Sequence, residues 1–148
     1  MPLWQETRIE QFLADHHAAL VEVFEQAYQI AGGHYAALAP AARRQQAEID
    51  SREFATDLLV QSINRTVITE IIQLAVDSTA VARDIIHMVM ALDPLICALI
   101  RRQLRDDPLL AAELERRTRL IVHTFRSGIL DAQIGHLLGR MQRGPRES

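Results

Sequence analysis

Apolar residues recur at helical spacing along most of the chain. Between about Arg8 and Ala31 they return every three or four residues, while acidic and amide side chains occupy the other faces. Thr7 and Glu10 have the spacing of a capping box, and the pair Gly32-Gly33 ends the pattern. The spacing therefore predicts one helix from about Arg8 to Ala31.

The middle of the chain also has helical patterning. Pro40 can open a short helix through Ile49, because the N–H that proline lacks has no partner in a first turn. Asp50 or Ser51 can then cap the next helix. The β-branched run at residues 66–69 lowers helix propensity. No neighbouring segment alternates with period two, so a strand there would lack a partner and we expect a helix.

The segment from Ile85 to Ile100 is apolar on almost every face, which indicates burial on most sides. It is interrupted by His87 and by Asp93-Pro94, and it is shorter than the ~20 residues of a bilayer-spanning helix. Residues 77–79 can cap it. We expect a buried core helix that Asp93-Pro94 either kinks or divides, and no contact with a membrane.

The last predicted helix runs from Pro108 to about Arg140 and carries two apolar faces. Glu113 and Arg117 stand four residues apart, as do Glu115 and Arg119, and such pairs support a helix. We expect the first apolar face to pack in the chain's own core. The second face has alternating spacings of three and four, which is a heptad pattern. This second face, the seam, consists of Leu120, His123, Ser127, Leu130, Ile134, Leu137 and Met141.

The seam predicts self-association. A second copy could cover it with the same seam in a two-fold contact, which would make a homodimer. His123 and Ser127 are polar interruptions that can set the register of such a pair. The alternative is that the seam packs against the first helix of the same chain.

Length and composition agree with packed helices. The chain has 148 residues, of which 49% are hydrophobic and only 5% aromatic, which suits one all-α domain and disfavours disorder. We predict five to seven helices in a single domain over residues 1–143, and a tail at residues 144–148. The residues expected in its core are Phe12, Leu20, Phe24, Leu58, Ile85, Met88, Leu92, Leu99, Ile121 and Phe125.

The net charge of −3 is small but unevenly placed. Residues 1–100 hold six arginines against thirteen acidic residues, whereas residues 101–148 hold ten against six. Most of the later arginines alternate with acids on one helix, as on a solvated face. No basic stripe accompanies a reading element, so we expect no nucleic-acid partner.

The sequence contains no recognisable catalytic or metal-binding motif. None of the six histidines stands in an H-E-x-x-H arrangement, and His16 and His17 point about 100° apart on a helix. No G-x-S-x-G elbow or glycine-rich phosphate loop occurs. We predict no catalytic residue, no metal ligand and no cofactor. Because these motifs are missing, we expect that the protein is not an enzyme. The single cysteine and the absence of a targeting pattern at the N-terminus lead us to expect a cytoplasmic protein.

His87 is the candidate for a small-molecule pocket, because it lies in the most apolar segment. Met88, Met90 and Cys97 are its predicted companions. A haem site would need one axial imidazole in an apolar pocket, and His87 could supply it. The competing interpretation is a core histidine hydrogen-bonded to backbone. Cys97 has apolar neighbours and no adjacent base, which predicts an unreactive thiol.

Four segments resemble a known family: FLADHHAALVEVF at residues 12–24, EFATDLLVQSI at 53–63, ARDIIHMVMALDPLICALIRRQL at 82–104 and ERRTRLIVHTFRSGILDAQI at 115–134. They are similar to the N-terminal sensor domains of stressosome RsbR-type proteins. The resemblance implies a globin-like dimer without haem, whose long last helix passes a signal to a following output domain. That domain is usually a STAS domain. We expect this chain to be a sensor domain alone or a piece of a longer protein.

The function expected from these observations is a non-catalytic sensor and dimerisation module in signalling or stress response. Two alternatives stay open. One is a haem-binding or other small-ligand globin-type sensor centred on His87. The other is the ligand-binding half of a transcription regulator, although residues 1–50 show no recognition helix of the helix-turn-helix type.

Overall fold

The computed structural model describes residues 3–63 and 65–143, and these residues form helices without strands, which confirms the all-α class. The predicted tail lies outside the described residues, and the globin-like arrangement stays a prediction. The described helices are α1 (Leu3–Asp15), α2 (His17–Ala31), α3 (Gly33–Ala36), α4 (Pro40–Val60), α5 (Arg65–Asp77), α6 (Thr79–Gln103) and α7 (Pro108–Arg143).

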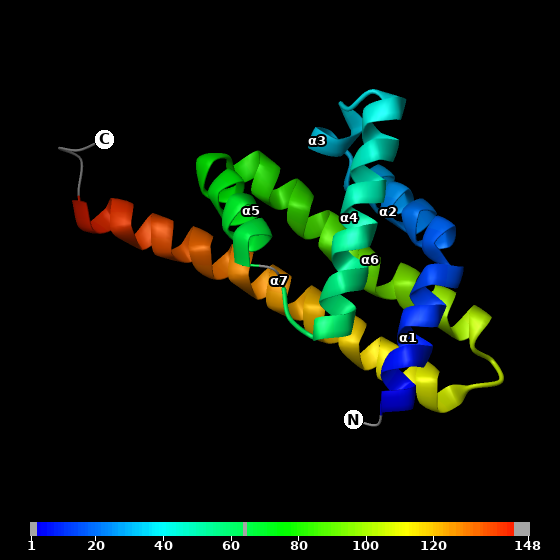
Figure 1. Ribbon diagram of the computed structural model, residues 1–148. Helices are drawn as coiled ribbons and strands as arrows, with labels where there is room; N and C mark the ends of the chain where they lie inside the picture. Colours follow the sequence, from blue (N-terminus) through cyan, green and yellow to red (C-terminus); the bar gives the residue numbers. More distant parts are fainter. Residues whose placement is uncertain (1–2, 64, 144–148) are drawn as a thin grey trace.

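The helices α6 and α7 form an antiparallel pair on which the others pack (Figure 1). Helix α2 lies along α6, and α4 packs on α2 and reaches α7. Helix α5 packs against both α6 and α7. The C-terminal end of α7, red in Figure 1, extends past α5 and away from the rest of the molecule.

The single helix predicted from Arg8 to Ala31 is wrong, because the chain bends at His16. This residue has φ −113° and ψ 19°, away from helical values. The backbone hydrogen bonds nevertheless continue on both sides, from His16 N–H to the Phe12 carbonyl and from Leu20 N–H to the His16 carbonyl. The apolar period therefore passes through the bend unchanged, and the sequence pattern could not reveal it.

The division predicted near Asp50 is also wrong, since α4 is continuous from Pro40 to Val60. The Asp50 carboxylate does not cap a helix; it accepts hydrogen bonds from Tyr28 and Gln46. The Ser51 hydroxyl donates to the Glu48 carbonyl at 3.1 Å. Both cap-type side chains therefore find partners in mid-helix.

Other boundaries agree with the sequence. Ser78 caps α6 by accepting a hydrogen bond from Val81 N–H at 3.3 Å. Helix α6 continues through Pro94, so the chain is not divided there. The β-branched run at 66–69 lies in α5 and is helical. Within the described residues, no helix has the length and apolarity needed to cross a membrane.

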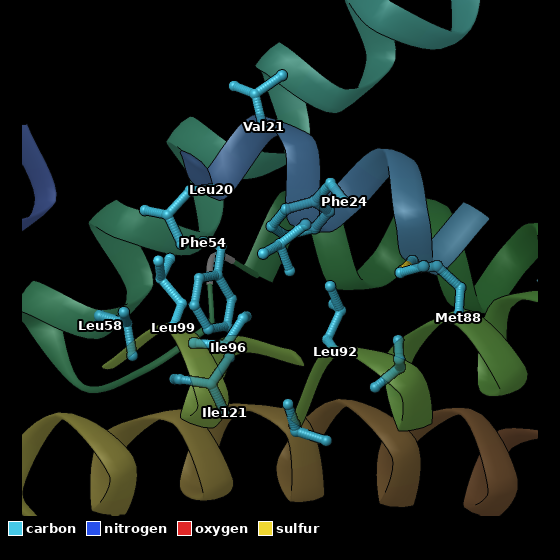
Figure 2. Packing of buried hydrophobic residues seen from close by; sticks show 14 of the residues in the cluster. Leu20, Val21, Phe24, Phe54, Leu58, Met88, Leu92, Ile96, Leu99 and Ile121 are labelled. Carbon is cyan, nitrogen blue, oxygen red and sulfur yellow. The ribbon is translucent and has the colours of Figure 1, made fainter. Parts of the chain in front are cut away.

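The core lies between α2, α4, α6 and α7 (Figure 2). Nine of the ten predicted core residues are buried, and Phe125 is half-buried. Phe24 and Phe54 meet edge to face with their ring centroids 5.9 Å apart. Leu92 and Ile121 bring α6 and α7 to the same core.

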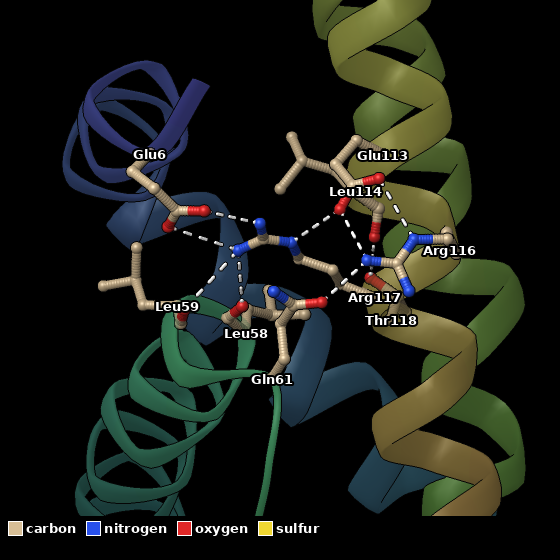
Figure 3. A network of polar contacts seen from close by, with 9 residues as sticks. All are labelled: Glu6, Leu58, Leu59, Gln61, Glu113, Leu114, Arg116, Arg117 and Thr118. Atoms are coloured by element: carbon tan, nitrogen blue, oxygen red, sulfur yellow. Dashed lines mark hydrogen bonds and ion pairs between the residues drawn. The ribbon is translucent and has the colours of Figure 1, made fainter. Parts of the chain in front are cut away.

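One arginine of the last helix lies off the solvated face on which most of them were expected. Arg117 has no exposed side-chain surface and extends between three helices (Figure 3). Its guanidinium donates to Glu6 on α1 at 2.7 Å, to Glu113 on α7 at 2.9 Å and to the Leu58 carbonyl on α4 at 3.0 Å. The predicted Glu113–Arg117 pair therefore exists, but as part of a buried network.

Candidate functional site

A cavity of about 410 Å³ lies among the helices beside the core. Five helices each contribute an apolar side chain to its wall. These side chains are Phe24 on α2, Phe54 on α4, Ile71 on α5, Leu92 on α6 and Phe125 on α7. Figure 2 shows Phe24, Met88, Leu92 and Ile121 turned toward the interior that these helices share. The volume of the cavity falls within the ~300–1,000 Å³ typical of small-molecule sites.

One side of the cavity is polar, and α4 provides most of it. Gln46, Asp50, Glu53 and Asp57 line the cavity at spacings of four, three and four residues, which place them on one helical face. His34 and Tyr35 from the short helix α3 add an imidazole and a phenol to the same lining. A strip of carboxylates therefore faces a largely hydrocarbon interior.

Asp50 is held by neutral donors. Its carboxylate accepts hydrogen bonds from the Tyr28 hydroxyl and from Gln46 Nε2, the latter at 2.8 Å. Burial raises the pKa of Asp50, and these two hydrogen bonds oppose the rise. Burial and the neighbouring Asp50 charge also raise the pKa of Tyr28, so the phenol stays protonated and remains a donor.

Glu53 lies one turn further along α4. Burial raises the pKa of its carboxyl, and the negative charges of Asp50 and Glu70 raise it further. Among the described residues, neither Asp50 nor Glu53 forms an ion pair with an arginine. Asp50 and Glu53 thus lack the counter-charge that Glu6 and Glu113 receive from Arg117.

The α3 end of the cavity is attached to α6 by a buried carboxylate. The backbone N–H of His34 donates to Asp84 Oδ2 at 2.9 Å. Gly33 has φ 51°, and a Cβ at this position would collide with the Asp84 carboxylate. Tyr35 then stacks on Tyr28 with their ring centroids 4.7 Å apart. These contacts hold His34 and Tyr35 at the cavity lining.

The predicted pocket of His87, Met88, Met90 and Cys97 is corrected at three of its four positions. Met88 lines the cavity, but His87 and Met90 are exposed and absent from the lining. Each residue of a helix turns by about 100°, so Met88 can face inward while its neighbours face outward. Cys97 is buried elsewhere, where its thiol donates to Asp93 at 3.2 Å and burial raises its pKa to about 12. His87 therefore does not contribute to the lining of this cavity.

The seam on α7 is exposed. The exposed fractions of its five apolar residues lie between 40% and 76%, His123 is exposed and Ser127 is half-buried. Packing of the seam against the first helix of the same chain is therefore wrong. Helix α1 meets α7 on another side and nearer its beginning, at Arg117. Pairing with a second copy stays a prediction.

The acidic strip of α4 was not predicted from the sequence. Its signal was present in the spacing of Gln46, Asp50, Glu53 and Asp57, but the predicted division at Asp50 split the strip between two helices.

Within the described residues, no three His, Cys, Asp or Glu side chains gather closely enough to hold a metal ion.

Comparison of the chain with family models, with curated proteins and with solved structures found no match.

Proposed function

We propose that this chain is a non-catalytic regulatory module that binds a small molecule in its cavity and acts through the position of α7. The observation that carries the proposal is that α7 contributes residues both to the cavity and to the exposed seam. Ile121, Val122 and Phe125 line the cavity, and the exposed seam begins at Leu120 on the same helix.

The two sets of residues alternate along the same turns of α7. Leu120 and His123 face solvent, whereas Ile121 and Val122 between them are buried at the cavity. A ligand that displaces the cavity wall must therefore displace this part of the seam. A ligand that prefers one position of α7 would shift the population of that position.

The partner in this proposal is a second copy of the chain. Apolar seam residues at heptad spacing suit a helix pair with two-fold symmetry, and exposed apolar surface of this kind marks interaction sites. The resemblance to stressosome sensor domains supports a role in signalling or stress response, with the end of α7 leading to an output partner. A cytoplasmic location belongs to the same proposal.

Sedimentation equilibrium of a cavity-filled variant tests the coupling. Leu92→Phe adds volume inside the cavity, and Leu109→Phe makes the same change at an exposed leucine near the start of α7. We expect Leu92→Phe to change the dimer dissociation constant by about fivefold or more, the lower range of allosteric coupling. Leu109→Phe should leave it unchanged. A wild-type chain that stays monomeric, or a folded Leu92→Phe variant with an unchanged dissociation constant, would overturn the proposal.

A further inference from the structure

Acidic side chains are prominent among the described lining residues of the cavity. Asp50, Glu53 and Asp57 contribute carboxylates, and among the described lining residues His34 is the only side chain that can become cationic. The remaining walls are mainly aliphatic and aromatic. A bound molecule must therefore match an apolar interior and a strip of anionic groups at one side.

The two carboxylates near the middle of the strip lack a cationic partner. Asp50 accepts from Tyr28 and Gln46, which are neutral, and Glu53 has no hydrogen-bond partner among the described residues. Both residues are half-buried, and a carboxylate partly removed from water without a counter-charge is destabilised. A positive charge brought into the cavity would relieve this destabilisation at both residues.

We infer that the cavity binds an organic cation, an amine whose ammonium group lies against Glu53 and Asp50 and whose apolar body fills the space beside Leu92. The inference rests on the proposed function and names the class of its ligand. The ammonium group supplies the missing counter-charge and can donate to the carboxylate oxygens. The rings of Phe54 and Tyr35 line the same cavity and add a favourable electrostatic surface for a cation.

Protonation of the carboxyls is the competing way to remove the buried charge. The raised pKa values of Asp50 and Glu53 are consistent with either outcome, because a group without a counter-ion holds its proton more tightly. The two cases differ in ligand preference. Neutral carboxylic acids would accept an alcohol as readily as an amine, whereas carboxylates favour the ammonium group.

Three probes with one apolar tail and different head groups distinguish these cases. The full chain is titrated calorimetrically at neutral pH with n-octylamine, 1-octanol and octanoate. We expect octylamine to bind at least about tenfold more tightly than octanol, which is the scale of one well-formed ion pair. Octanoate should bind more weakly than octanol, since its charge has the same sign as the strip.

Three variants test whether the preference for octylamine arises in the cavity. Glu53→Gln keeps the size of the side chain and removes its charge, so it should bring octylamine to within about threefold of octanol while octanol binding is unchanged. Glu22→Gln, an exposed position outside the lining, removes the same charge from the protein and should leave the preference intact. Leu92→Phe should weaken all three probes.

The outcomes separate this inference from the proposed function. Octanol binding as tightly as octylamine, or an octylamine preference that survives in Glu53→Gln, would show that the ligand class is wrong while a small-molecule cavity remains. No binding by any probe, together with an altered dimer dissociation constant in Leu92→Phe, would also reject the cation and retain the coupling of cavity and seam.

Discussion

The Arg117 guanidinium lies 2.7 Å from the Glu6 carboxylate, although the two residues are 111 positions apart in the chain. The same guanidinium donates to the carbonyls of Leu58 and Leu59, which belong to the last turn of α4. Carbonyls at a helix end have no partner within their own helix. Arg117 therefore holds α1, α4 and α7 together with one side chain.

Arg117→Ala is expected to lower the free energy of unfolding by about 3–5 kcal/mol, since it leaves a partly buried carboxylate and helix-end carbonyls unpaired. The neighbouring Arg116 bonds Glu113 and Gln61 but is half-exposed, so Arg116→Ala should lower it by about 1 kcal/mol or less. Urea denaturation of both variants gives the comparison. Equal losses in the two variants would contradict the role assigned to Arg117.

Stability should fall in acid through Glu113. Hydrogen bonds from Arg116 and Arg117 lower the pKa of Glu113 to about 2 from its ordinary value of 4.5, although burial opposes them. A lowered folded-state pKa stabilises the protein above the unfolded value, and this contribution is lost as pH falls from 4.5 toward 2.

The check is urea denaturation of wild type and Glu113→Gln at a series of pH values. The difference in free energy of unfolding between them should be largest at neutral pH and shrink in acid. Glu10→Gln, at an exposed position on α1, serves as the matched control. A difference that does not change with pH would contradict the assignment.

Charge in the seam should prevent pairing of two copies. Ile134→Glu with Leu137→Glu places two carboxylates where the proposed partner helix packs, so we expect a folded monomer in sedimentation. Both positions are more than half exposed, so the fold itself should tolerate the change. Leu109→Glu puts the same group on an exposed leucine outside the seam and should leave the dimer intact. A dimer that persists in the double variant would place the interface elsewhere.

The contact between Gly33 and Asp84 should appear as energetic coupling. Gly32 and Gly33 have φ of 66° and 51°, but only a Cβ at Gly33 would meet another group, the Asp84 carboxylate. Alanine at either glycine should lower stability by about 1–3 kcal/mol through backbone strain. Asp84→Ala should be non-additive with Gly33→Ala and additive with Gly32→Ala, as a double-mutant cycle would measure. Additivity in both cycles would show that the Asp84 side chain moves away from the added methyl group without loss of stability.

The sequence by itself determined that the chain is helical and where most of its core positions lie. A 3.6-residue apolar period is a local property, so it located the core positions from Phe12 to Ile121 before any partner was known. It also separated the two faces of α7, and the seam that it defined is exposed.

Only the tertiary structure decided what polar residues do. A charge pair such as Glu113 and Arg117 has the same spacing on a solvated face and in a buried network; Glu6 and the end of α4, distant in sequence, determine which one forms. The bend at His16 kept its hydrogen bonds and so left no mark on the pattern. The strip of Asp50, Glu53 and Asp57 lines a cavity only because five other helices contribute the rest of its wall. Burial of charge depends on contacts between distant segments, and a local period does not encode them.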